Sequence, residues 1–76
     1  MIKRILKEKA DQNDELFRME FFCDSEADVG VLPTQKTPAD IGRCSTGSLA
    51  YVLEPDAGKS RLRILTSFGL WKEVGV

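Results

Sequence analysis

The sequence predicts a mainly β protein, a small antiparallel sheet or barrel-like meander of about five short strands. Two patterns predict it. Residues 16–23 alternate between apolar and polar side chains, and residues 47–76 hold three short apolar runs separated by turn sequences. Residues 24–46 follow neither period and leave room for one helical turn. We therefore expect a single small β domain over 1–76, divided into an N-terminal hairpin over 1–23, an irregular loop over 24–46 and a C-terminal meander over 47–76.

The first segment of the hairpin fits two kinds of structure. Ile2, Ile5 and Leu6 would line one side of a helix, but residues 2–9 also suit a strand. We favour the strand because a polar turn over 10–14 then joins two segments of matched length. The second segment has an apolar face that we expect to pack against a core, formed by Phe17, Met19, Phe21 and Cys23.

The middle segment is irregular and contains prolines at positions 33 and 38. Asp24 or Ser25 suits the N-cap of one helical turn over 24–28. Proline restricts the residue before it, so Leu32 and Thr37 are predicted to be extended. Long irregular segments in compact proteins are often functional. We therefore look to this loop first for a binding surface.

The first strand of the meander, over 48–54, is apolar on both faces. Such a strand is central in its sheet or covered on both sides. One face carries Leu49, Tyr51 and Leu53, and the other carries Ala50 and Val52.

The next strand, over 60–66, alternates between leucine or isoleucine and arginine. Leu62 and Ile64 are predicted to face the core, and Arg61 and Arg63 to point to solvent.

Two turns separate the last three strands. Gly58-Lys59-Ser60 resembles the end of a phosphate-binding loop, but Leu53 stands where that motif needs a glycine, and a strand follows instead of a helix. We therefore assign a hairpin turn there. Gly69 suits the left-handed position of the last turn, after which Trp71 leads the final strand.

Composition excludes several classes of function. Eleven basic and twelve acidic residues give a formal net charge of −1, whereas nucleic-acid-binding proteins usually carry a basic face. No apolar run approaches the roughly 18 residues of a membrane span. A chain of 76 residues has a thin core, so oligomerisation or docking onto a larger body is expected to add stability.

Reactive groups are scarce. Histidine, the commonest general base and metal ligand, is absent from the sequence. Cys23 and Cys44 have no partner residues at zinc-site spacing, and we expect them to be reduced, buried packing residues. The acidic cluster of Asp24, Glu26 and Asp28 lacks the glycine and glutamate of a calcium loop and suits a solvated turn. We therefore predict no catalytic, cofactor or metal site.

Four motifs occur together in this chain. They are a Leu32-Pro33-Thr34 step after an acidic segment, Gly47-Ser48-Leu49-Ala50-Tyr51-Val52, Leu62-Arg63-Ile64-Leu65, and Ser67-Phe68-Gly69-Leu70-Trp71-Lys72-Glu73-Val74. In this combination the chain resembles small structural proteins of tailed bacteriophages. The resemblance implies a β module on a phage head or tail, often trimeric or present in many symmetric copies.

We therefore expect a non-enzymatic virion protein, made in the host cytoplasm, that decorates or attaches to the capsid as a head decoration or fibre base. Its contacts would come from the sheet and the loop. Its partners would be a phage capsid or tail protein and further copies of itself, with a trimer favoured, and no nucleic acid or membrane. The alternative is a small host-directed regulator or inhibitor that binds a bacterial protein. The contact or core anchors that we expect are Phe22, Leu32, Phe68 and Trp71.

Overall fold

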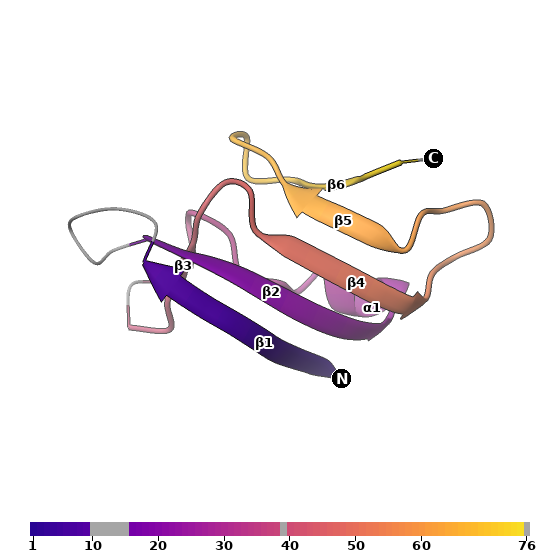
Figure 1. Ribbon diagram of the computed structural model, residues 1–76, viewed down its shortest axis with the longest axis horizontal. Coiled ribbons are helices and arrows are strands. Elements are labelled where there is room, and N and C mark those ends of the chain that lie inside the picture. Colours follow the sequence, from indigo (N-terminus) through magenta and orange to yellow (C-terminus); the bar gives the residue numbers. More distant parts are fainter. Residues whose placement is uncertain (10–15, 39, 76) are drawn as a thin grey trace.

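The computed structural model describes residues 1–9, 16–38 and 40–75 and confirms a mainly β fold. Six strands and one short helix lie within this part of the chain. The elements are β1 (Ile2–Lys9), β2 (Leu16–Ser25), α1 (Glu26–Val29), β3 (Arg43–Cys44), β4 (Leu49–Glu54), β5 (Leu62–Leu65) and β6 (Trp71–Glu73). The paired strands follow an open path, β1-β2-β4-β5-β6, with β3 beside β2, so the sheet is not a closed barrel (Figure 1).

The strand directions correct one prediction. β1 and β2 form the expected antiparallel hairpin, and β4, β5 and β6 form the expected antiparallel meander. The two units join through β2 and β4, however, and these strands are parallel. Parallel neighbours need a long crossover connection, and the irregular segment between them supplies it. The sheet is therefore mixed instead of antiparallel.

Local expectations in the crossover are partly confirmed. The single helical turn is present as α1, with Ser25 in extended conformation at its N-cap. β3 was not predicted, because a strand of two residues is too short to show a period. Further along, Gly69 has the left-handed conformation expected of it, with a φ of 77°. The polar turn predicted over 10–14 lies outside the described residues.

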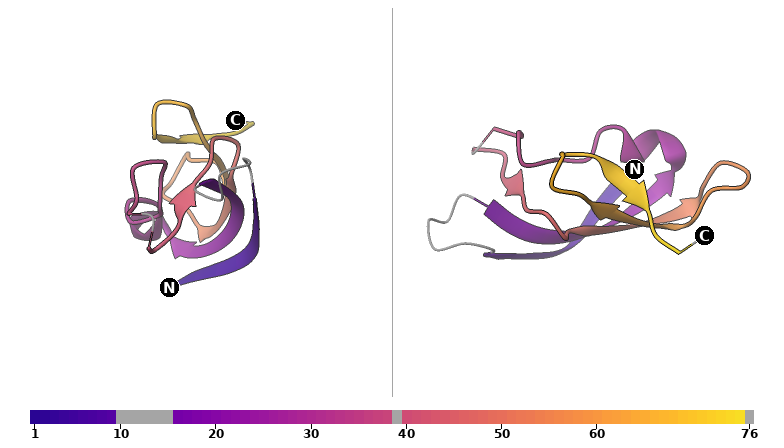
Figure 2. Two further views of the ribbon diagram at one scale, coloured as in Figure 1. Left: turned by 90° about the vertical axis from the view of Figure 1, so that its left-hand side faces the viewer. Right: turned by 90° about the horizontal axis from the view of Figure 1, so that it is seen from above.

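The core lies between one face of the sheet and the crossover. Figure 2 shows the crossover with α1 lying over that face, while the opposite face carries no covering layer in the described part of the chain. The predicted apolar face of β2 is confirmed, because Met19, Phe21 and Cys23 are buried. The other buried apolar residues are Ala50 and Val52 from β4, Leu65 from β5, and Leu32 and Cys44 from the crossover.

The predicted orientation of β5 is wrong. Arg63 and Leu65 face the core, with Arg63 only 3% exposed, whereas Leu62 lies on the outer face. Both faces of this strand offer apolar residues, so its period does not decide which one is buried. In the observed orientation, Arg63 binds an acidic partner on α1.

Ser48 holds the join between the parallel strands. Its buried hydroxyl accepts a hydrogen bond from the Met19 N–H at 3.0 Å and donates one to the Ser45 carbonyl at 2.9 Å. A buried N–H without an acceptor costs about 1–3 kcal/mol. The serine of the Gly-Ser motif is therefore a structural residue.

Replacing Ser48 by alanine is expected to destabilise the protein by about 2 kcal/mol, because the Met19 N–H loses its acceptor. In a domain of this size the melting temperature would fall by about 10 °C. Thermal unfolding followed by circular dichroism measures this. The control is Ser67→Ala, in an exposed turn, which should melt like the wild type; equal losses from the two variants would contradict the role of Ser48.

Candidate interaction surface

The two cysteines are free, buried thiols, as predicted. Burial raises the pKa of both the Cys23 and the Cys44 thiol above the ordinary value. The thiolate is the nucleophilic form of cysteine, so a raised pKa keeps these groups unreactive near neutral pH. Neither thiol is an activated nucleophile.

The acidic cluster is paired with cationic groups. Asp24 and Asp28 accept hydrogen bonds from the Met1 ammonium at 3.1 and 2.9 Å, and Glu26 binds Arg63. The prediction of a solvated turn therefore holds for Asp24, whose side chain is 63% exposed, but is wrong for Glu26 and Asp28, whose side chains are 19% exposed. Within residues 1–9, 16–38 and 40–75, no group of three or more His, Cys, Asp or Glu side chains is arranged to hold a metal ion.

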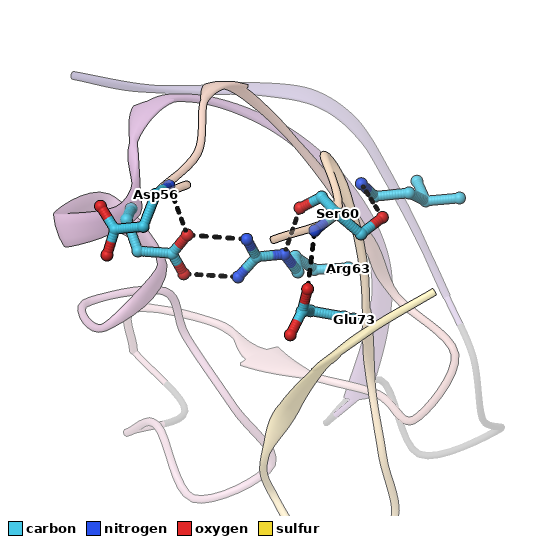
Figure 3. A network of polar contacts seen from close by, with 6 residues as sticks. Asp56, Ser60, Arg63 and Glu73 are labelled. Atoms are coloured by element: carbon cyan, nitrogen blue, oxygen red, sulfur yellow. Dashed lines mark hydrogen bonds and ion pairs between the residues drawn. The ribbon is translucent and has the colours of Figure 1, made fainter. Parts of the chain in front are cut away.

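The pair of Glu26 and Arg63 fastens α1 to the sheet. The Arg63 Nη1 and Nη2 groups donate to the two Glu26 carboxylate oxygens at 2.6 and 2.7 Å, a bidentate geometry. The Arg63 Nε donates to the Ser60 carbonyl at 2.9 Å, and the Asp56 N–H donates to Glu26. Figure 3 shows how this network joins the β4–β5 turn to β6, where Glu73 accepts from the Ser60 N–H.

Acid stability should depend on Glu26. Hydrogen bonds from Arg63 lower the pKa of the Glu26 carboxyl from 4.5 to about 2. A carboxyl with a lowered pKa in the folded state stabilises the fold fully above its unfolded pKa, and this contribution is lost as the pH falls through the folded pKa. The difference in unfolding free energy between wild type and Glu26→Gln should therefore shrink as the pH falls from 4.5 to about 2. Urea unfolding at a series of pH values measures it, and a constant difference would contradict the assignment.

The uncovered side of the sheet is apolar. Residues directly opposite in neighbouring strands share a face, and the register Phe22↔Tyr51↔Leu62 therefore places these three side chains in one row across β2, β4 and β5. We call this side the open face and define it by Ile5, Phe22, Leu49, Tyr51, Leu53 and Leu62, which line one groove of about 490 Å³.

The side chains of the open face are exposed to solvent, and two of them pack against each other. Phe22 and Tyr51 pack edge to face, with ring centroids 5.8 Å apart, and each is 40% exposed. Leu53 is 48% exposed. Ile5 joins the face at an irregularity in the pairing of β1, where the register shifts between Arg4 and Leu6. Apolar side chains are thus concentrated where no other part of the described chain covers them.

Charged residues lie beside the apolar residues of the open face, and one of them, Glu20, lines the same groove. A second row runs across the same side of the sheet, from β1 to β6. Its residues are Leu6, Glu20, Leu49, Ile64 and Lys72, one from each of β1, β2, β4, β5 and β6. Glu20 accepts a hydrogen bond from Arg18 at 3.0 Å. An apolar centre with a polar rim is the usual composition of a protein–protein interface.

The four predicted anchor residues divide into two groups. Leu32 is buried in the core, and Trp71 packs against the core, with its ring edge-on to Phe21 and its Nε1 donating to the Pro33 carbonyl at 3.2 Å. Phe22 lies on the open face, and Phe68 is 83% exposed in the β5–β6 turn. The structure therefore does not bring the four together.

A second, smaller apolar surface lies on the other side of the molecule, which carries the crossover. Val31, Phe68 and Leu70 are exposed there. They flank or line a groove of about 250 Å³ between α1 and the β5–β6 turn, floored by Leu32 and Trp71. We call Val31, Phe68 and Leu70 the turn surface.

Sequence reasoning identified Phe22 and Phe68 but missed most of the open face. The signal that could have found it was the strand over 48–54, which is apolar on both faces. That strand is central, as predicted, but the described residues cover it on one side only.

No protein-family model matches the chain, and neither a curated protein nor a solved structure shows significant similarity to it. Among the described residues, no helix has the length and apolar character needed to cross a membrane.

Proposed function

We propose that this protein is a non-enzymatic interaction protein, a structural component of a phage virion that attaches to the capsid or tail surface. The observation that carries the proposal is the pair of exposed apolar surfaces on opposite sides of one small sheet, the open face and the turn surface. A protein with an apolar surface on each side is suited to lie between neighbours in an assembly.

Energetics support an attached state. The core contains eight buried apolar residues among those described, two of them cysteines and one an alanine. Small domains with so little core commonly gain stability by binding a partner in the folded state. Covering the exposed leucines and aromatic rings would supply about 25 cal/mol for each Å² of apolar surface removed from water.

The virion is proposed as the location because of the resemblance of the Gly-Ser-Leu-Ala-Tyr-Val and Gly-Leu-Trp-Lys-Glu-Val motifs to those of phage structural proteins. In this proposal the turn surface contacts the capsid or tail protein. Its residues come from the crossover and the β5–β6 turn, and turns at the end of a rigid sheet commonly carry binding contacts.

Co-sedimentation with particles of the phage that encodes the chain tests the proposal. The wild type should sediment with the particles at a fixed stoichiometry of many copies per particle. Phe68→Lys should abolish sedimentation, because it places a charge within the proposed contact. The control is Ile41→Lys, which changes an exposed apolar side chain outside both surfaces and should sediment normally.

Failure of the wild type to sediment would overturn attachment to the virion. Capture of one bacterial protein at equal stoichiometry would then favour the alternative, a host-directed regulator.

A further inference from the structure

We propose that the open face is a twofold interface between two copies of this chain. The proposal extends the proposed function but does not depend on the virion as its location. It assigns an occupant to the larger of the two apolar surfaces and leaves the turn surface free for another partner.

The arrangement of the strands makes the face self-complementary. β4 lies between β2 and β5, so a twofold axis along β4 sets β2 of one copy over β5 of the other. Tyr51 then lies over Tyr51, and Phe22 of one copy lies over Leu62 of the other, because these residues occupy one row. A twofold interface needs such self-matching, since the same patch serves both partners.

The charges at the border agree with this axis. Glu20 lies on the β2 side of the second row and Lys72 ends that row on the β6 side. Rotation about β4 sets Glu20 of one copy over Ile64 of the other, the neighbour of Lys72 in the same row, so Glu20 and Lys72 are diagonal neighbours across the interface, twice in the dimer. Pairs of opposite charge at the rim set the register of an interface and exclude wrong ones.

The side of the sheet that carries the open face is large enough for a stable dimer. A standard interface buries about 800 Å² on each partner, which is about one sixth of the 4956 Å² surface of this chain. The open face lies within one broad side of a molecule measuring 39 by 22 by 17 Å, the side toward the viewer in Figure 1. Two such faces packed together form a sheet-on-sheet sandwich about 10 Å apart, with a second apolar core between them.

The aromatic content of the open face and the net charge of the chain also favour a second copy as the partner. The edge-to-face pair of Phe22 and Tyr51 supplies the rings that are enriched at the centres of interfaces. The formal net charge of −1 places almost no overall repulsion between two copies.

Light scattering after size-exclusion chromatography tests the interface, at loading concentrations from about 1 μM to about 1 mM, which detect a dimer whose dissociation constant is millimolar or tighter. The wild type should reach twice the 8.5 kDa mass of one chain. Leu53→Lys should weaken dimerisation at least about tenfold, because it places a charge on the apolar face that the dimer buries. The matched control is Leu70→Lys on the turn surface, since Leu70 is 53% exposed and Leu53 is 48% exposed; it should dimerise like the wild type.

Charge reversal tests the axis. Glu20→Lys and Lys72→Glu should each weaken the dimer, and the double variant should recover it, because the pair is restored with its signs exchanged. Circular dichroism confirms that each variant keeps its fold.

A wild type that stays monomeric throughout, or forms the trimer favoured by the resemblance, would overturn the twofold interface. Equal effects of Leu53→Lys and Leu70→Lys would also overturn it. Either result leaves co-sedimentation with particles as a separate question, because that contact uses the turn surface. A dimer that does not bind particles would instead keep the interface and reject the virion.

Discussion

Replacing Arg63 by alanine is expected to lower the free energy of unfolding by about 3 kcal/mol, because Glu26 keeps its charge but loses its partner. The Glu26 side chain is only 19% exposed, so water does not fully replace the guanidinium. In a domain of this size, the melting temperature would fall by at least about 12 °C. Thermal unfolding followed by circular dichroism measures the loss.

Two comparisons make the Arg63 experiment specific. Arg61→Ala removes an exposed arginine of the same segment and should change the unfolding free energy by no more than about 0.5 kcal/mol. Replacing both Arg63 and Glu26 by leucine should cost less than Arg63→Ala, because no unpaired charge remains. Equal melting temperatures for Arg63→Ala and Arg61→Ala would contradict the stabilising role of the Arg63–Glu26 pair.

Replacing Trp71 by alanine is expected to cost about 3 kcal/mol, through lost packing against Phe21 and a lost hydrogen bond to Pro33. Trp71→Phe keeps most of the packing and removes the indole N–H, so it should cost less, about 1 kcal/mol. Chemical unfolding followed by circular dichroism suits both variants, because Trp71 is the one tryptophan in the sequence.

Phe68→Ala is the matched control for Trp71, since both aromatic residues were predicted as anchors and only Phe68 is fully exposed. It should leave the unfolding free energy within about 0.5 kcal/mol of the wild type. If the two alanine variants lost stability equally, the division into a core tryptophan and a surface phenylalanine would be wrong.

Local patterns in this chain predict local structure well. β2 alternates strictly enough that its buried face follows from the sequence, and Gly69 marks a turn that needs a positive φ. These features depend on neighbours within a few residues. The β fold class, the hairpin and the meander could therefore be predicted.

Features decided at long range could not be predicted. Leu62 and Ile64 are apolar enough to form a core face, so the strand itself does not show that Arg63 points inward. The partner of the buried Arg63 is Glu26, 37 positions away in the sequence. The direction of β4 relative to β2 depends on how the crossover passes over the sheet, and it cannot be predicted from the sequence of either strand. For the same reason, sequence alone did not separate Leu32 and Trp71 in the core from Phe22 and Phe68 on the surface.

The parallel join between β2 and β4 has a consequence for how the chain folds. The hairpin and the meander each contain pairings between segments close in sequence, which form early because little loop entropy is lost. The join pairs Glu20 with Leu49 and Cys23 with Val52, and it can form only after the crossover has closed. Folding should therefore be limited by the docking of two preformed units, with a rate set by this one long loop. Substitutions at Ser48 and within the β5–β6 turn would then both slow folding, because the turn belongs to a unit that has formed before the join closes.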